Sequence, residues 1–193
     1  LDLTGLPPTP AEVEEFVKDG SSDAHAKVVD RLLSSPHFGE RWGRYWLDLA
    51  GYVDVVGRDV QAVGYRVGEG RWRYRDYVVR AYQNDKPLSD FLREQIAGDE
   101  LFDWRKADKY TPDQVEKLTA TGFLRTAEDP TDNSERDTPL LRYEVLHQTV
   151  EILTSSVMGL TVGCARCHDH KFDPIPQRDY YRLMATLAPA YNA

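Results

Sequence analysis

The sequence predicts a mainly α-helical protein, a single multi-helix domain with a long glycine-containing loop or small hairpin around residues 51–70. Helix-starting signals and apolar residues at helical spacing recur along most of the 193 residues, whereas alternation with a period of two is rare. With 41% hydrophobic and 29% charged residues, the chain can build a substantial core and has the charge content of an ordinary soluble protein. We therefore expect residues 1–193 to form one domain.

Three helices are expected in the first fifty residues. The run Thr9-Pro10-Ala11-Glu12 is a capping pattern for a helix that ends near residue 18. Ser22 or Asp23 can cap the second helix, and Ser35-Pro36 begins the third. The third helix carries large apolar residues at helical spacing, which we expect in the core: Phe38, Trp42, Tyr45, Trp46 and Leu49.

The rest of the chain is again mostly helical in pattern. Five glycines interrupt short Val and Tyr runs in residues 51–70, which is typical of a loop or hairpin. A polar stretch over residues 128–138 indicates a surface loop, and Ile175-Pro176 leads into a last helix in which Met184 is expected in the core. The remaining helical patterns cover residues 71–82, 88–101, 112–124 and 139–158.

The charge and hydropathy of the chain exclude two classes of partner. Twenty-four Lys and Arg residues against 32 Asp and Glu give a net charge of -8, so we expect no nucleic-acid partner. No stretch approaches the roughly 18 to 20 apolar residues that a membrane helix needs, so no membrane span is expected in this segment. Because the chain begins at Leu1 with neither an initiator Met nor a signal peptide, we expect it to be excised from a larger protein.

The most informative motif is Cys164-Ala165-Arg166-Cys167-His168, which contains the only two cysteines of the chain. C-x-x-C-H is the pattern by which one haem is attached covalently and ligated through its iron. Two thiols three positions apart on a helical turn lie on one side of it and can add to the two vinyl groups of one porphyrin, and the histidine can then bind the iron. The motif predicts one covalent haem c, held by Cys164 and Cys167, with His168 as an axial ligand.

Two other uses of these cysteines stay open. A structural zinc site would need two further ligands, from His168 and His170 or from the distant His147 or His37. Four ligands within seven residues are geometrically awkward, because structural zinc sites usually draw their second ligand pair from a segment about a dozen or more residues away. The third reading is a disulfide or a reduced dithiol.

The second axial ligand of the iron is expected upstream of the motif, because only 25 residues follow His168. On the helix over residues 139–158, a stripe beside the apolar face contains His147 and Met158. These two residues are about 16 Å apart along a helix, so at most one of them can bind the iron, and His147 is our candidate. His170 would lie about 200° around a continuing helix from His168 and so point away from the haem.

Haem propionates need cationic or hydrogen-bonding partners, and two segments could supply them. Arg41 and Arg44 each directly precede an aromatic residue of the third helix, and residues 71–75 alternate arginine with aromatic residues. The alternative is that these arginines form ordinary surface ion pairs and stacking contacts.

Four stretches together resemble the planctomycete cytochrome c-type domain family: LDLTGLPP at residues 1–8, GERW at 39–42, YRDY at 74–77 and GLTVGCARCHDHKFDPIPQRDYY at 159–181. The resemblance implies a domain of a large secreted protein, beside a small cytochrome c module and a further C-terminal domain. Tyr45 departs from the histidine that many relatives carry there, which puts a haem or metal role for that position in doubt.

These observations lead to one expected function and two alternatives. We expect a c-type cytochrome domain that transfers electrons between fused domains or with a redox partner protein, in an extracytoplasmic (periplasmic or secreted) location, where thioether-bound haem is normally assembled. One alternative is a haem enzyme or small-ligand sensor with an open sixth iron position. The other is a zinc-stabilised interaction module.

Overall fold

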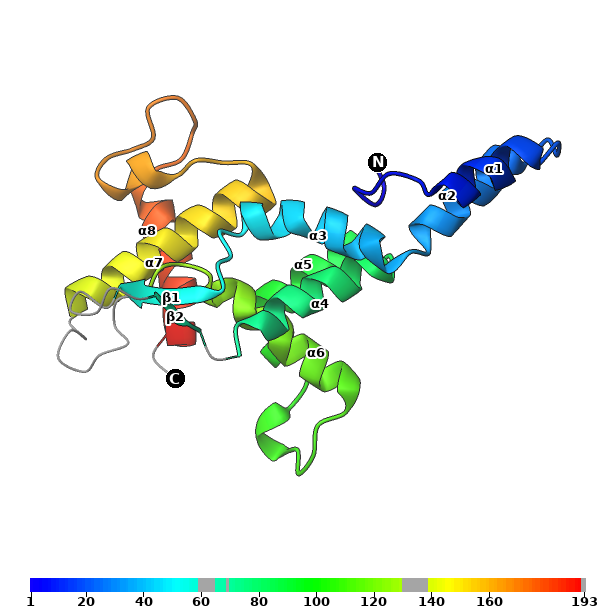
Figure 1. Ribbon diagram of the computed structural model, residues 1–193. Coiled ribbons are helices and arrows are strands. Elements are labelled where there is room, and N and C mark those ends of the chain that lie inside the picture. Colours follow the sequence, from blue (N-terminus) through cyan, green and yellow to red (C-terminus); the bar gives the residue numbers. More distant parts are fainter. Residues whose placement is uncertain (59–64, 69, 130–138, 192–193) are drawn as a thin grey trace.

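The computed structural model describes residues 1–58, 65–68, 70–129 and 139–191, and within these ranges the protein is mainly helical, as predicted (Figure 1). The helical patterns read from the sequence all correspond to helices. In chain order the α-helices are α1 (Pro10–Lys18), α2 (Ala24–Leu33), α3 (Pro36–Leu49), α4 (Trp72–Gln83), α5 (Leu88–Ala97), α6 (Pro112–Ala120), α7 (Pro139–Leu153) and α8 (Gln177–Leu187).

Several of these helices end in tighter or wider turns than the sequence patterns suggested. α5 continues as the 3₁₀ turn Gly98–Glu100, and α6 continues as the 3₁₀ turn Thr121–Arg125. α7 ends in a π-helical turn, Thr154–Met158, which completes the predicted helix over 139–158. Gly159 then adopts a left-handed conformation with φ 65°, which stops the helix.

The expected hairpin is present in the glycine-rich region. β1 (Val55–Arg58) pairs antiparallel with β2 (Tyr65–Val67), and Val55 lies opposite Val67. Residues 59–64, which connect the strands, lie outside the described residues, as does most of the expected polar loop at 128–138. None of the described helices has the length and apolarity that crossing a bilayer requires.

The core forms around Trp46 on α3. Its indole Nε1 donates hydrogen bonds to Gln95 Oε1 (2.8 Å) and to the hydroxyl of Tyr74 (3.0 Å), and Tyr74 in turn donates to the same Gln95 oxygen (2.5 Å). The rings of Phe91 and Phe123 pack against the indole at centroid distances of 5.0 and 5.8 Å. This arrangement joins α3, α4, α5 and the turn after α6 through one buried cluster.

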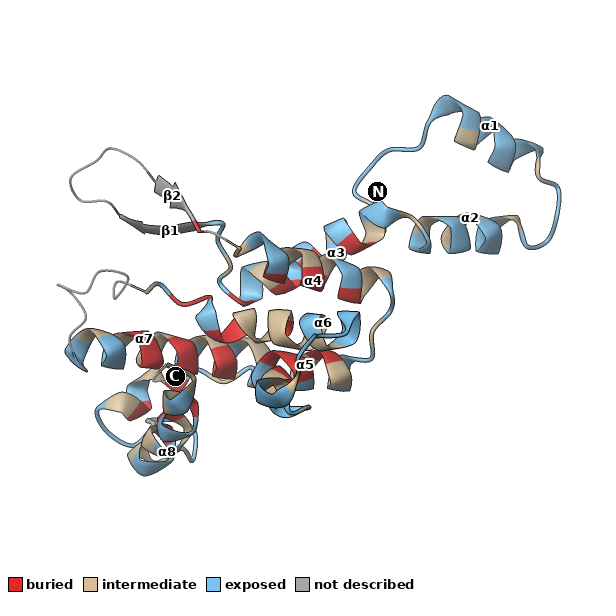
Figure 2. Cartoon of the chain, turned by 90° about the horizontal axis from the view of Figure 1, so that it is seen from below, coloured by how far each residue is buried: buried red, intermediate tan, exposed pale blue. Residues whose placement is uncertain are grey.

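The first two helices form an arm that extends away from this core (Figure 1). α1 begins with the predicted capping box, in which Thr9 accepts from the Glu12 amide and the Glu12 carboxylate accepts from the Thr9 amide. Neither α1 nor α2 contains a buried residue, as Figure 2 shows by its exposed and intermediate colours.

The predicted burial of the α3 aromatic stripe is wrong for most of its members. Trp46 is buried, but Trp42, Tyr45 and Leu49 are 37%, 47% and 58% exposed. The described elements pack on α3 mainly from the side of α4, so only the face of α3 toward that helix is covered. The stripe is wide enough around the helix that its outer members face solvent.

Two glycines let α3 and α4 approach closely. A Cβ atom at Gly39 would lie 2.5 Å from the Val79 carbonyl oxygen, and one at Gly43 would lie 3.4 Å from the same residue's backbone. The Gly39 amide also donates to the Gln83 side chain (3.1 Å). The short distance between α3 and α4 therefore requires glycine at position 39, because any side chain there would clash with α4.

Gly39→Ala is expected to lower the free energy of unfolding by about 1 to 3 kcal/mol, because α4 must move away from the added methyl group. Urea unfolding followed by circular dichroism measures the change. Gly20→Ala is the matched control, since nothing lies within 4 Å of a Cβ there. Equal stability of the two variants would contradict the close approach.

Candidate functional site

The Cys164–His168 motif forms a helical turn between the end of α7 and the start of α8. Gly163–Arg166 is a 3₁₀ turn, and the amides of Cys167 and His168 both donate to the Cys164 carbonyl (3.3 and 3.4 Å). Ala165 is fully buried, whereas both cysteines are free thiols exposed to solvent. The turn therefore presents its two sulfur atoms on the outside of the protein and anchors itself by the residue between them.

The imidazole of His168 is exposed and oriented by the backbone. Its Nδ1 lies 2.7 Å from the carbonyl oxygen of Asp169. A carbonyl oxygen can only accept, so Nδ1 carries the proton and the lone pair of the neutral ring is on Nε2. A hydrogen bond of this kind on the other ring nitrogen is what normally orients a metal-binding histidine.

Arg166 ties the motif to both neighbouring helices. Its guanidinium donates to the Glu144 carboxylate on α7 (2.9 and 3.5 Å), and this interaction raises the pKa of the guanidinium. Its carbonyl oxygen accepts from the Gln177 side chain (3.0 Å) and from the Tyr181 hydroxyl (2.9 Å) on α8. The position of the turn is thus fixed by side chains from two helices.

The segment after His168 is a loop held by His170, so the position that His170 would take on a continuing helix does not apply. The His170 side chain is only 5% exposed, and its Nδ1 accepts from the amide of Asp173 (2.9 Å). An Nδ1 that accepts from an amide carries no proton, so the 3.2 Å approach of the Asp173 carboxylate is not an ion pair. Asp169 Oδ1 accepts from the Gln177 amide (2.8 Å) and so caps α8. The chain leaves the helix because these side-chain bonds replace the helical ones.

His147, the candidate distal ligand, lies on α7 with its side chain 12% exposed. Its Nδ1 is 2.6 Å from the hydroxyl of Tyr180 on α8, and its Nε2 is 3.6 Å from a Glu151 carboxylate oxygen. The Glu151 carboxylate lies against the backbone of Gly163, where an added Cβ would be 2.2 Å from it. The structure therefore brings His147 close to the start of the motif through Glu151, with both ring nitrogens facing protein groups.

Arg41 and Arg44 lie on α3, and their observed contacts are to other residues than those of the motif. Arg41 stacks over Tyr45 at 5.5 Å and packs against the backbone at Gly5. Its Nε is buried and has no hydrogen-bond partner among the described residues. Arg44 is 3.7 Å from Asp48 in an exposed pair.

A preformed zinc site is absent from the described part of the chain, where no three His, Cys, Asp or Glu side chains converge as metal ligands. His37, one of the distant candidates, instead lies 2.9 Å from Glu40 in the first turn of α3.

Two residues that support the motif, Glu144 and Glu151, were not predicted from the sequence. They are spaced by three and four positions from the predicted His147, so all three share one face of α7. That helical spacing is the sequence feature from which their common face could have been predicted. The partners Arg166 and Tyr181 could not be paired with this face from local patterns, because they lie in other elements.

The fold and this site define a class of protein: a mainly helical protein that presents a C-x-x-C-H turn with two free thiols at its surface. The chain belongs to the family described as "PSCyt2: Protein of unknown function (DUF1549)", whose model matches residues 1–191. That description states no activity, so the resemblance to cytochrome c-type domains stays a prediction. A search of curated proteins finds no match. A search of solved structures finds none either.

Burial raises the pKa of the Tyr180 hydroxyl to about 12, from 10.0. Above pH 10 the unfolded chain loses this proton first, so the contribution of Tyr180 to stability is present below pH 10 and disappears as the pH rises to about 12. The wild type should therefore lose up to about 3 kcal/mol relative to Tyr180→Phe across this window. Urea unfolding of both proteins at pH 8, 10 and 12 checks this, and a constant difference would refute it.

Proposed function

We propose that this protein is a c-type cytochrome domain that carries one covalent haem c and transfers electrons between fused domains or with a redox partner protein. The observation that carries the proposal is the preformed Cys164–His168 turn, with two unpaired thiols and an oriented imidazole on its outer side. When bound, the haem supplies one-electron exchange between ferric and ferrous iron. The proposal implies maturation outside the cytoplasm.

The two thiols and the imidazole of the turn fit the requirements of a covalent haem. Cys164 and Cys167 are separated by one turn and have no disulfide between them, so both sulfurs are available for thioether bonds. His168 keeps the Nε2 lone pair for the iron because its Nδ1 proton is bound to the Asp169 carbonyl. Ala165, between the two cysteines, is fully buried, so the turn packs on the protein through this residue and leaves both thiols exposed.

The surrounding residues would limit movement of the ligands as the iron changes charge. Arg166 is held from α7 by Glu144 and from α8 by Gln177 and Tyr181. A fixed ligand set is what electron transfer requires, since less rearrangement accompanies each change of oxidation state.

An apolar side chain near the motif in the chain is exposed. Phe172, four residues after His168, is 83% exposed, and its ring lies 6.5 Å from that of His170. Exposed apolar groups near an attachment site can contact a porphyrin or a partner protein. With both thiols and His168 exposed, a haem held there would be partly accessible to solvent, and solvent exposure is one of the determinants of its potential.

Protein made with haem-attachment machinery in an extracytoplasmic compartment should retain its haem after denaturation and organic extraction. Its intact mass should exceed the polypeptide mass by one haem group. Cys164→Ala with Cys167→Ala should abolish both results and keep the helical circular dichroism spectrum, because neither sulfur is packed in the core. Stoichiometric zinc without porphyrin in the matured wild type would defeat the proposal.

A second candidate function is favoured by the surroundings of His147. The Nδ1 of His147 is held by the Tyr180 hydroxyl, and its Nε2 faces the Glu151 carboxylate. The sixth iron position would therefore be free for a small molecule unless that carboxylate moved away from Nε2. A haem enzyme or small-ligand sensor uses such an open position.

The spin state of the ferric protein separates the two functions. If His147 is a ligand, the wild type is low-spin and binds cyanide slowly, and His147→Ala makes it high-spin and ligand-accessible. If the sixth position is open, the wild type is already high-spin and His147→Ala leaves the optical spectrum unchanged. Tyr180→Phe, which removes the hydrogen-bond partner of His147, serves as the control for indirect effects.

A further inference from the structure

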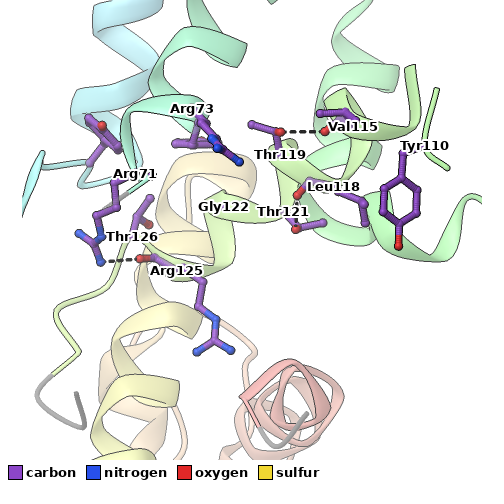
Figure 3. Close-up of a pocket in the computed structure, with 13 residues that line it drawn as sticks. Arg71, Arg73, Tyr110, Val115, Leu118, Thr119, Thr121, Gly122, Arg125 and Thr126 are labelled. Carbon is purple, nitrogen blue, oxygen red and sulfur yellow. Dashed lines mark hydrogen bonds between the residues drawn. The ribbon is translucent and has the colours of Figure 1, made fainter. Parts of the chain in front are cut away.

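We propose that the protein has a second binding site, separate from the cysteine turn, for a small organic anion with an apolar body and a carboxylate or phosphate group. The site is a pocket of about 560 Å³ between the start of α4, helix α6 and the turn Thr121–Arg125 (Figure 3). None of its lining residues belongs to the Cys164–His168 motif. The proposal therefore does not depend on haem attachment.

The charge of the pocket is positive although the protein as a whole is acidic. Among the described residues that line it, the charged ones are Arg71, Arg73 and Arg125, in a chain with a net charge of -8. The ion pairs found within the described ranges join arginines elsewhere on the molecule to their carboxylates, and none of them includes these three. Three guanidinium groups that pair with no carboxylate of the described residues favour an anionic ligand in this pocket.

Two of these arginines are held in place by neutral groups. Arg71 donates to the carbonyl oxygens of Arg125 (2.9 Å) and Val53 (3.4 Å). Arg125 donates to the Ala190 carbonyl (2.7 Å) and stacks over the ring of Tyr191. Carbonyl oxygens orient a guanidinium without cancelling its charge, and each group has five N–H donors. Arg71 and Arg125 thus provide fixed positive charge at one end of the pocket.

Arg73 is the residue available to contact a ligand directly. It is exposed at the start of α4, and its guanidinium makes no hydrogen bond to any of the described residues. The guanidinium lies over the neighbouring Trp72 ring, 5.6 Å from its centroid. The opposite wall contains Val115 and Leu118 of α6, which offer an apolar surface to the body of a ligand.

The hydroxyl groups of the pocket restrict what can be recognised. Each donates its proton within the protein: Thr119 to the Val115 carbonyl (2.7 Å), Thr121 to the Leu118 carbonyl (2.7 Å), and Tyr110 to the Trp104 carbonyl (3.2 Å). Thr126, Tyr52 and Tyr74 also donate to internal acceptors. The guanidinium N–H groups are then the side-chain donors left for a ligand, and these match the acceptor-only oxygens of a carboxylate or phosphate.

The test compares 2-naphthoate with 2-naphthalenemethanol, which has the same apolar body without the charge. Both are titrated into the full chain, as matured and as the cysteine double variant, by isothermal calorimetry. The wild type should bind the acid roughly three- to tenfold more tightly than the alcohol, the range for a charged hydrogen bond in an open site. Arg73→Ala should remove this preference.

Arg178→Ala is the matched control, because it makes the same change of charge on the exposed surface of α8, outside the pocket. It should keep the preference for the acid. Backbone amide shifts of Thr119 and Gly122 should respond to the acid in the wild type, which locates the binding. Equal affinity for acid and alcohol, no saturable binding, or equal losses in the two arginine variants would each overturn the proposal.

Discussion

The buried hydrogen bonds of Trp46 are the interaction on which the helical body depends. The indole N–H, the Tyr74 hydroxyl and the Gln95 side-chain amide are all removed from water, so each must find its partner in the same small space. That requirement fixes α3, α4 and α5 relative to one another more strictly than apolar contact alone, which tolerates sliding. The narrow spacing at Gly39 is compatible with this arrangement because α3 and α4 then meet at backbone distance.

The candidate site lies where a second layer, α7 and α8, continues from this body. The phenol of Tyr191, after α8, contacts Thr149 on α7 (2.6 Å) and donates to the Leu124 carbonyl in the turn after α6, so the two layers share hydrogen bonds. The cysteine turn is supported from the side of the protein and open on the other side. Such a division would suit the covalent attachment proposed above, because the protein orients the Cys164–His168 turn while its thiols and imidazole stay accessible. The arginine pocket is built in a similar way: neutral carbonyl oxygens hold the cationic groups of Arg71 and Arg125 in place and leave their charge available to a ligand.

Much of this architecture could be predicted from local patterns, and the failures have physical causes. Caps and helical spacing predicted the helices because both act within a few residues, as the Thr9 box shows. Burial of Trp42 and Tyr45 was mispredicted because a periodic pattern shows which residues share a face and not whether another helix covers it. The orientation of His170 could not be derived from helical spacing, because side-chain hydrogen bonds replace the helix after the motif. The Glu144–Arg166 pair joins different elements, so its formation depends on tertiary structure.

The arm formed by α1 and α2 is helical but contributes little to the stability of the protein. Both helices are regular and well capped or paired, yet neither has a buried residue, so little apolar surface is exposed when they open. Their amide protons should therefore exchange with solvent by local opening, whereas those of α4 and α5 should exchange only when the helical core unfolds. Helical content would then fall in two stages on heating, and a single melting temperature would describe only the second.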